Sequence, residues 1–545
     1  MKKPADNSTS ASSSAVLDPI RHVVVLMLEN RSFDHMLGDA TRLYPGLDGI
    51  PQHGPKYRNV ATRDGIAYEQ KPQAASKIAV DPPHEHAVVL RQINGGAAGV
   101  MGGFVDTYLE VPGVSVSNPD QVEQIMDYFP LGDTPGADSL PALHTLARNF
   151  LVCDRWFSSM PGSTWSNRFF AHSGTCLGQV LMPSRQHPEY MHVYNQDTVY
   201  DRLGAAGKSW RIYHDGIPQS IVMTHLLAKI LTAHYAAMDH FYRDAAGAEA
   251  DFPEYVFIEP SYFGETENDQ HPPSDIAPGD QLIADVYNAL RANEALWQST
   301  LLIVTYDEHG GLYDHVVPPA TVAPDTHTEQ YSFTQLGVRV PAILISPWVK
   351  QGVCQTPFDH TSILRYVCDK WNMPPLGLRT APAAGALQAN SLLPELTRLS
   401  SPRTDTPAAI SARPLPRMLA PKKEPPLQDS REALLQFVAQ LPEINQQPGR
   451  IAYAIGPAAR APRKLSDAQL QARAEQRFSQ LMAAKKTLRT NATLPPEPRK
   501  KPARKKMPAS KKVSASGAAK TAKARKPNKL AAFGRYKIRQ KKTSG

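Results

Sequence analysis

Apolar residues gather in short continuous runs along the first 400 residues of this chain. The clearest run is "VVVLML" at residues 23–28, where six consecutive positions are β-branched or aliphatic. Runs of this length are too short to cross a membrane and are typical of strands buried on both faces. We predict further strands at residues 255–260, 301–311 and 340–348, and a weaker one at 209–215.

Segments with helical spacing alternate with these runs. Residues 279–297 carry apolar side chains every three or four positions, and we expect this helix to start at a cap formed by Gly279 and Asp280. Residues 359–371 predict a second helix that begins near Asp359. Alternation of this kind predicts an α/β fold, with a large and mostly parallel sheet flanked by helices on both faces.

The pattern changes at both ends of the chain. The first residues are polar and Ser-rich, a composition typical of disordered segments. Beyond residue 400 the chain is Pro-rich, and two helical patterns follow at residues 429–441 and 466–486. We therefore divide the chain into a disordered N-terminus (1–18), a catalytic domain (19–400), a Pro-rich and helical extension (401–490) and a disordered basic tail (491–545).

Charge is distributed unevenly along the chain. Residues 499–545 contain 18 Lys or Arg and no Asp or Glu, so the net charge of +9 divides into +18 here and −9 elsewhere. Polycations bind polyanions, and we expect this tail to contact an anionic membrane surface or nucleic acid. A body that serves only to carry such a tail is an alternative of a different class.

The sequence gives few signs of compartment. Its four cysteines form no close Cys-x-x-Cys pair, and they do not amount to a disulfide scaffold. We find no signal peptide and no apolar run of eighteen residues. The default expectation is therefore a cytoplasmic protein without a transmembrane segment, and export by a leaderless route stays open.

Polar residues follow the predicted strands at the ends where ligands bind in α/β sheets. Glu29 and Asn30 follow the first run, and Asp307 and Glu308 end the apolar part of the run that starts at residue 301. Buried carboxylates are costly unless they are compensated, so a divalent cation is expected there. Glu259 ends another predicted strand, and two loops rich in acids and histidines lie at residues 81–86 and 268–275.

A candidate nucleophile lies in the Gly-, Pro- and Ser-rich segment around residue 164. Thr164 follows Gly162 and Ser163, and Asn167 and Arg168 come shortly after it. A hydroxyl beside a metal ion loses its proton readily and can attack phosphorus. Arginine offers a planar fork of donors that suits phosphoryl oxygens, whereas Ser and Thr in turns often serve only local hydrogen bonding.

Together these segments resemble a known family. The motifs are "ENRSFDHMLG" (29–38), "PGSTWSNR" (161–168), "NDQHPPSDI" (268–276) and "TYDEHGGLYDHVVPP" (305–319). They are similar to those of the bacterial phosphoesterases that include phospholipases C and respiratory-burst-inhibiting acid phosphatases. The resemblance covers about residues 20–375 and implies a fold like that of alkaline phosphatase.

The resemblance assigns roles residue by residue. It implies metal binding by Glu29, Thr164, Asp307 and Glu308, and catalysis by Thr164 as nucleophile and by His271 as leaving-group acid or phosphate donor. It also implies substrate binding by Asn30, Asn167, Arg168, His84 and His214, with His86 as a competing match for His84. The family commonly has proline where Ser163 and Ser166 stand, so this loop departs from the pattern. Zn, Ca, Mn and Fe remain open as the divalent metal.

The resulting prediction is a metal-dependent phosphoesterase that works through a phospho-threonine intermediate. We favour a phospholipase C that acts on a phospholipid and releases diacylglycerol, with acid phosphatase as the alternative for a small phosphate ester. A choline headgroup would require an aromatic cage. The aromatic residues near the motifs are Trp156, Trp165, Tyr262, Phe263, Tyr306 and Tyr313.

Overall fold

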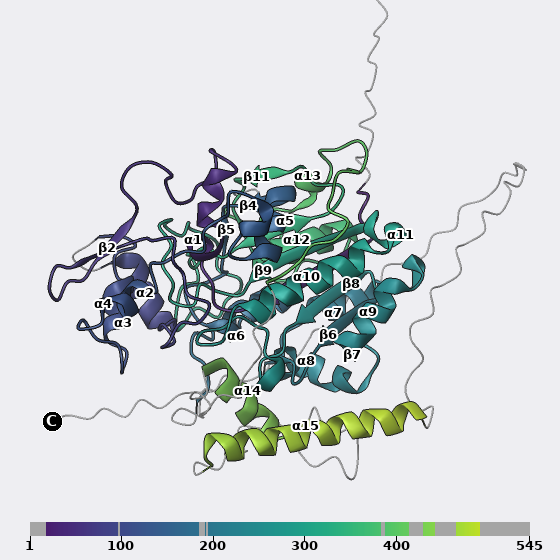
Figure 1. Ribbon diagram of the computed structural model, residues 1–545. Coiled ribbons are helices and arrows are strands. Elements are labelled where there is room, and N and C mark those ends of the chain that lie inside the picture. Colours follow the sequence, from purple (N-terminus) through teal and green to yellow (C-terminus); the bar gives the residue numbers. More distant parts are fainter. Residues whose placement is uncertain are drawn as a thin grey trace, which may run out of the picture. The chain divides into compact units, whose positions relative to one another are not determined.

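The computed structural model describes residues 18–95, 99–184, 191, 194–382, 387–413, 429–441 and 465–490 (Figure 1). The chain divides into one compact unit over residues 1–498 and a second over residues 499–545. All described residues belong to the first unit. The predicted disordered N-terminus and basic tail therefore lie almost entirely outside the described residues.

An eight-stranded sheet forms the centre of the described unit, with strand order β11-β4-β10-β9-β1-β8-β6-β7. All neighbouring pairs are parallel except the two that involve β10. This mostly parallel sheet confirms the predicted α/β class. The strands are β1 (His22–Leu28), β4 (Leu151–Cys153), β6 (Trp210–His214), β7 (Tyr235–Ala237), β8 (Tyr255–Glu259), β9 (Thr300–Tyr306), β10 (Ala342–Ile345) and β11 (Gly352–Cys354).

The register of the central strands decides which residues meet at the sheet edge. β1 is paired along its whole length with β9, so that Leu28 lies beside Tyr306. On its other side, Leu26 of β1 lies beside Ile258 of β8. Because all three strands run in the same direction, their carboxyl ends open onto one edge.

All five predicted strands are present, and three further strands of this eight-stranded sheet were missed. β4, β7 and β11 are only three residues long. Segments this short carry no usable apolar periodicity, and they become strands because a neighbour supplies hydrogen bonds. β10, the predicted strand at residues 340–348, runs antiparallel to both neighbours.

Helices cover both faces of the sheet, as predicted. The ring of Tyr200 in α7 (Val199–Ala205) packs on Trp210 of β6, and Phe241 of α9 (Met238–Ala246) packs on Tyr213 of the same strand. Side chains three positions apart on a strand point to opposite faces. α7 and α9 therefore lie on opposite sides of β6.

The predicted helix at 279–297 is two helices in the structure. α10 (Ala277–Arg291) ends before Asn293, whose side chain accepts a hydrogen bond from the backbone of α11 (Glu294–Trp297). The predicted cap at Gly279-Asp280 was wrong, because α10 begins two residues earlier. Asp280 instead accepts hydrogen bonds from the first-turn amides of a different helix, α5 (Pro141–Asn149). The other predicted helix is α12 (His360–Lys370), which follows Asp359 as expected.

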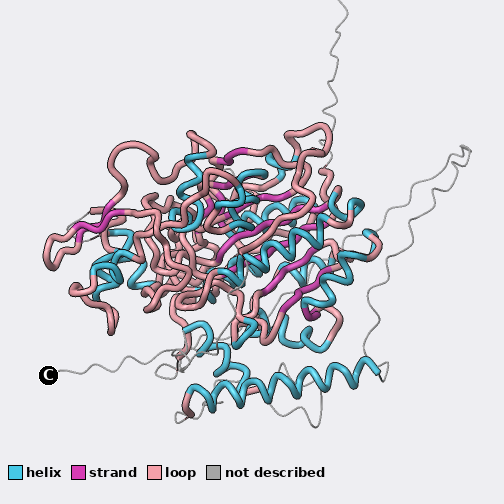
Figure 2. Tube along the Cα trace, in the orientation of Figure 1, coloured by secondary structure: helices cyan, strands magenta, loops and turns pink. Residues whose placement is uncertain are grey.

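Two helices of the predicted extension also belong to this unit. They are α14 (Asp429–Ala439) and α15 (Asp467–Thr490), which contact each other and the short helical segments Gln219–Val222 and Ala228–Leu231. Among the described residues, none of the helices has the length and apolar character to span a membrane. Figure 2 shows a dense group of loops beside the strands, and the candidate site is built from these loops and the strand ends.

Candidate active site

The ends of β1 and β9 continue their pairing into the loops that follow. The backbone N–H of Asn30 donates to Oδ1 of Asp307 (3.0 Å), and that of Arg31 donates to the carbonyl of Glu308 (3.0 Å). Asn30 adopts a positive φ of 58°, and a Cβ added to Gly310 would lie 2.4 Å from the Asn30 carbonyl oxygen. The two loops therefore touch backbone to backbone, which fixes the predicted acidic residues in place.

Arg168 lies between two of the predicted metal ligands. Its guanidinium is 3.3 Å from Oε1 of Glu29 and 3.2 Å from Oδ2 of Asp307, and all three side chains are buried. Burial raises the pKa of Glu29 well above its ordinary value and that of Asp307 to about 6, although the charge of Arg168 opposes both shifts. Burial lowers the pKa of Arg168, but the neighbouring acidic groups, led by Tyr262 and Asp307, raise it overall.

Not every polar atom of this cluster has a partner. Among the described residues, Oε2 of Glu29, Oε1 of Glu308 and Nη1 of Arg168 are buried without a hydrogen bond. Oε2 of Glu308 accepts from the backbone N–H of Gly310 (2.8 Å). Buried carboxylate oxygens without partners are unfavourable, and a bound cation would compensate them. These residues fit a divalent cation in charge and chemistry.

Thr164 occupies the first position of α6 (Thr164–Ser173) and is fully buried. Its hydroxyl donates to Oδ1 of Asn30 across 3.4 Å. The free backbone N–H groups at the start of a helix bind anions such as phosphate. The structure thus brings the predicted nucleophile and the predicted phosphate ligand together at a helix N-terminus.

Two predicted histidines lie on the other side of Asn30. Nε2 of His84 is 3.2 Å from Nδ2 of Asn30, and the rings of His84 and His271 are in edge-to-face contact at 5.5 Å. Burial lowers the pKa of His84, but the charges of Glu308 and Asp81 raise it to about 10. Burial and the charge of His84 lower the pKa of His271 well below its ordinary value. The pair therefore holds one charged and one neutral imidazole at neutral pH.

The described residues include three groups that could hold a metal ion. One is Asp81, His84 and His271, whose ligand atoms lie within 4.8 Å of one another. The predicted set of Glu29, Asp307 and Glu308 is not among these groups; its first two members both contact Arg168 instead. The remaining groups are Asp34–Asp314–His315 and Asp197–Asp201–His225.

Two predicted substrate ligands point elsewhere. The amide of Asn167 donates to the carbonyl of Gly162 (3.0 Å) and accepts from the N–H of Met160 (3.0 Å), so it organises the loop before Thr164. Nδ1 of His214 donates to the carbonyl of Gly216 (2.8 Å), and its ring packs on Tyr235 and on Phe478 of α15. Neither side chain contacts the carboxylate cluster through any interaction described.

Glu259 is fully engaged in local hydrogen bonding. Its carboxylate accepts from the backbone N–H groups of Gln219 (2.6 Å) and Ser220 and from the hydroxyl of Tyr262 (3.0 Å). A carboxylate with this many donors needs no cation. The expectation that this strand-end acid marks metal chemistry is therefore replaced by a structural role.

Sequence reasoning missed two residues that contact the cluster or its backbone. Nε2 of Gln219 donates to Oε1 of Glu29 (2.6 Å). Arg431 of α14 pairs with Asp269 (2.9 Å), whose backbone carbonyl in turn accepts from the N–H of Glu29 (2.9 Å). Both lie in segments without a motif, and their contacts span long sequence separations. Of the two, only Arg431 could have been noticed in the sequence. It lies near the start of a helix, where the helix dipole disfavours a positively charged side chain.

Comparison with known proteins gives three results. The sequence model of the phosphoesterase family matches residues 20–374. Non-specific phospholipase C3 of Arabidopsis thaliana is 32% identical over 75% of this chain and 79% of its own, and phospholipase C B of Mycobacterium tuberculosis is 28% identical over 66% and 74%. The solved phosphonate monoester hydrolase of Agrobacterium radiobacter aligns over 69% of this chain and 77% of its own with a TM-score of 0.30 and 10% identity.

Proposed function

Because the chain belongs to the phosphoesterase family, we propose that it is a phosphodiester hydrolase of the phospholipase C type. The observation that carries this proposal is the position of Thr164. Its hydroxyl faces the Asn30 amide at the N-terminus of α6, and the backbone N–H of Asn30 in turn donates to the buried carboxylate of Asp307. The similarity to curated relatives named as phospholipases C supports the diester substrate.

In this proposal Thr164 attacks the phosphorus and forms a covalent phospho-threonine, which water then hydrolyses. The amide of Asn30 and the N–H groups at the start of α6 stabilise negative charge on the phosphoryl oxygens. Arg168 lowers the pKa of Glu29 and Asp307 against the effect of burial rather than binding substrate directly, since its guanidinium already contacts both. This assigns Arg168 a positioning role in place of the predicted substrate contact.

The two histidines are proposed to handle the leaving group. The raised pKa of His84 favours its charged form, and we assign it as the acid that donates to the departing oxygen. His271, the acid expected from the sequence, is neutral beside it and can accept the proton of the incoming water. Because the two rings are in contact, the same site would protonate the leaving group in the first step and accept a proton from water in the second.

We propose that three carboxylates and one hydroxyl hold a divalent cation. These groups belong to Glu29, Asp307, Glu308 and Thr164. Such a cation would supply positive charge that favours the threonine alkoxide and a bound phosphoryl oxygen. Carboxylate oxygens favour Ca²⁺ or Mn²⁺, whereas recruitment of His84 or His271 would favour Zn²⁺ or Fe.

Five of the six aromatic residues near the motifs are buried, and Phe263 is partly buried. Trp156, Trp165, Tyr262 and Tyr306 are each at most 3% exposed and pack in the core. Tyr306 also donates its hydroxyl to Gln270. We therefore propose that the enzyme binds its substrate mainly through the phosphodiester group and less through a quaternary ammonium headgroup.

The test compares p-nitrophenyl phosphorylcholine with p-nitrophenyl phosphate, each with and without a chelator. We expect turnover of the diester that is lost in Thr164→Ala and on chelation. Ser166→Ala is the matched control, because this hydroxyl lies on the same helix and donates to the carbonyl of Gln179 (2.9 Å). Turnover of the monoester alone would instead assign an acid phosphatase.

The absence of turnover on either substrate, in a folded protein supplied with metal, would contradict the enzymatic proposal. It would favour the alternative of an inactive body that presents the basic segment over residues 491–545 to a polyanion. That segment lies outside the described residues, so its binding to an anionic membrane surface or to nucleic acid stays a prediction. A cytoplasmic location likewise stays a prediction.

A further inference from the structure

Two thiols lie side by side at the edge of the sheet farthest from β7. Cys153 ends β4, Cys354 ends the edge strand β11, and the two residues are direct partners in the parallel register. Aligned residues on neighbouring strands point to the same face of the sheet. Neighbouring strands lie about 4.8 Å apart, which is inside the range of Cα separations that disulfides span. Both cysteines are free and buried.

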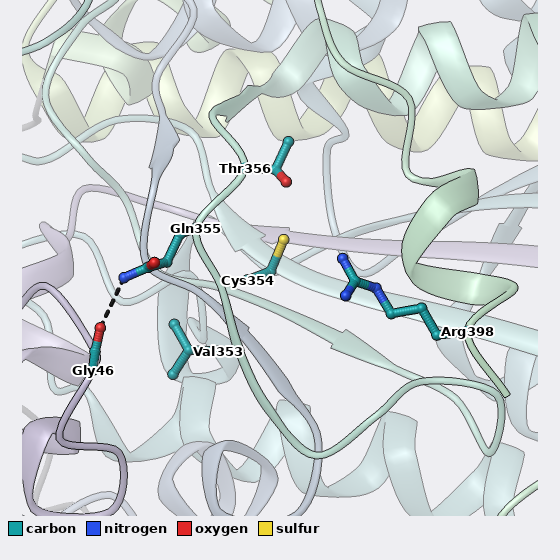
Figure 3. A pocket seen from close by; sticks show the side chains of 6 residues that line it. All are labelled: Gly46, Val353, Cys354, Gln355, Thr356 and Arg398. Carbon is teal, nitrogen blue, oxygen red and sulfur yellow. Dashed lines mark hydrogen bonds between the residues drawn. The ribbon is translucent and has the colours of Figure 1, made fainter.

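An open pocket of about 490 Å³ gives access to one of these thiols. Its lining comprises Gly46, Val353, Cys354, Gln355, Thr356 and Arg398. Figure 3 shows the guanidinium of Arg398 reaching across the pocket toward the sulfur of Cys354, while the amide of Gln355 turns away to the carbonyl of Gly46. Cys354 therefore faces a polar, solvent-connected space that a small oxidant can enter.

The pKa values of the two thiols are shifted in opposite directions. A hydrogen bond from Cys153 lowers the pKa of Cys354, with burial opposing and Thr356 assisting. Burial raises the pKa of Cys153 well above its ordinary value. The other two thiols, Cys176 and Cys368, have pKa values that burial raises to about 12. Reactivity toward oxidants follows the thiolate and its access, so Cys354 stands apart from the other three.

We propose that Cys354 is a peroxide-reactive thiol and that Cys153 is its resolving partner. The thiolate of Cys354 attacks one oxygen of a hydroperoxide; the O–O bond breaks, and an alcohol or water leaves after taking up a proton. Sulfur is oxidised by two electrons to a sulfenic acid and the peroxide is reduced. The thiol of Cys153 then attacks this sulfur, the S–O bond breaks, and the hydroxide leaves as water with the thiol proton.

The disulfide formed in this way would join the edge strand to the segment that leads to the nucleophile. The backbone N–H of Asp154 already donates to the carbonyl of Cys354 (3.2 Å), which holds the two strand ends together. No backbone element has to move to bring the two cysteines into register. The modification site is independent of the proposed hydrolase activity, because neither cysteine contacts the carboxylate cluster through any interaction described.

The test treats the reduced full-length protein with hydrogen peroxide, blocks the remaining thiols under denaturing conditions, and maps the peptides by mass spectrometry. We expect a peptide pair linked through Cys153 and Cys354, lighter by two hydrogen atoms. In Cys153→Ser the sulfenic acid on Cys354 is expected to persist and to react with dimedone. Cys176→Ser and Cys368→Ser are matched controls and should form the same linked pair as the unchanged protein.

A second measurement needs no variant. Native, reduced protein is exposed briefly to iodoacetamide, and labelling of each cysteine is followed in time. We expect Cys354 to react about tenfold faster than Cys176 and Cys368. Equal labelling of the four thiols, or peroxide treatment that leaves Cys153 and Cys354 unlinked, would overturn the proposal.

Discussion

Two buried clusters of carboxylates in this protein each surround one arginine, and they differ in how completely they are satisfied. Arg339 pairs with Asp34 (3.0 Å) and Asp314 (2.9 Å), and all three of its guanidinium nitrogens donate hydrogen bonds. Arg168 pairs with Glu29 and Asp307 at longer distances, and its Nη1 has no partner among the described residues.

The difference indicates different roles. In the Arg339 cluster the carboxylate oxygens also accept hydrogen bonds from His315, Gln70 and backbone N–H groups. These acids are close enough to hold a cation, but their hydrogen bonds already compensate their charge. In the Arg168 cluster the unpartnered oxygens of Glu29 and Glu308 remain. A saturated network fixes the fold, whereas an incompletely satisfied one is available for a ligand. The predictions that follow test this contrast.

Replacing the arginine of the saturated cluster should have the largest effect. Arg339→Met removes the arginine partner of Asp314 and leaves Asp34 with His315 as its charged partner, and we expect a loss of about 3–5 kcal/mol in the free energy of unfolding. Urea unfolding at neutral pH measures this loss. The control is Arg243→Met, which removes an exposed pair with Asp239 and should cost under about 1 kcal/mol. Equal losses in the two variants would refute the structural role.

Removing a charge from the unsaturated cluster should act on catalysis instead. Glu308→Gln keeps an oxygen for the N–H of Gly310 but lacks the negative charge for a cation. We expect kcat on a phosphodiester to fall about 10²–10³-fold. The free energy of unfolding should not fall, because Oε1 of Glu308 has no protein partner to lose. Asp314→Asn should show the opposite pattern, and a variant that lost both properties equally would remove the contrast.

Stability should depend on pH through His315 in the saturated cluster. Burial opposes its charge, but the charge of Asp34 and hydrogen bonds to Asp34 and Asp48 raise the pKa of His315 to about 9. Because the pKa is higher in the folded state, protonated His315 stabilises that state. The contribution is complete at pH values below the unfolded-state pKa of about 6.5 and is lost as pH rises through about 9. The contribution is at most about 3 kcal/mol. Denaturant midpoints of the unchanged protein and His315→Gln, compared from pH 6 to 10, should therefore converge at high pH.

The smallest expected effect comes from the outer support of Glu29. Arg431→Gln removes the ion pair to Asp269, whose carbonyl holds the N–H of Glu29. We expect about a tenfold loss in kcat/KM and a similar loss in metal affinity, measured by titration of the metal into chelator-treated protein. Arg431→Lys should restore part of both, and Arg243→Gln should change neither. Unchanged metal affinity in Arg431→Gln would exclude the positioning role.

Sequence patterns predicted the long central elements well. The apolar runs that became β1, β8 and β9 are five to seven residues long and completely buried, so their patterns required little context. The helix at residues 279–297 shows the limit of this reasoning. The helical spacing of apolar residues continues past Asn293, but the side chain of Asn293 caps a new helix. Asp280, the predicted cap, instead accepts hydrogen bonds from the backbone N–H groups of α5. Local periodicity does not record such distant partners.

The sequence by itself determined the family motifs and the placement of acids directly after β1 and β9. These acids meet because neighbouring parallel strands end at the same edge of a sheet. Only the tertiary structure decided how those acids are compensated. Arg168 reaches Asp307 across 139 residues, and Gln219 reaches Glu29 across 190. A buried charge is stabilised by whichever donors the fold brings within about 3 Å, and that choice depends on chain packing rather than on neighbouring residues.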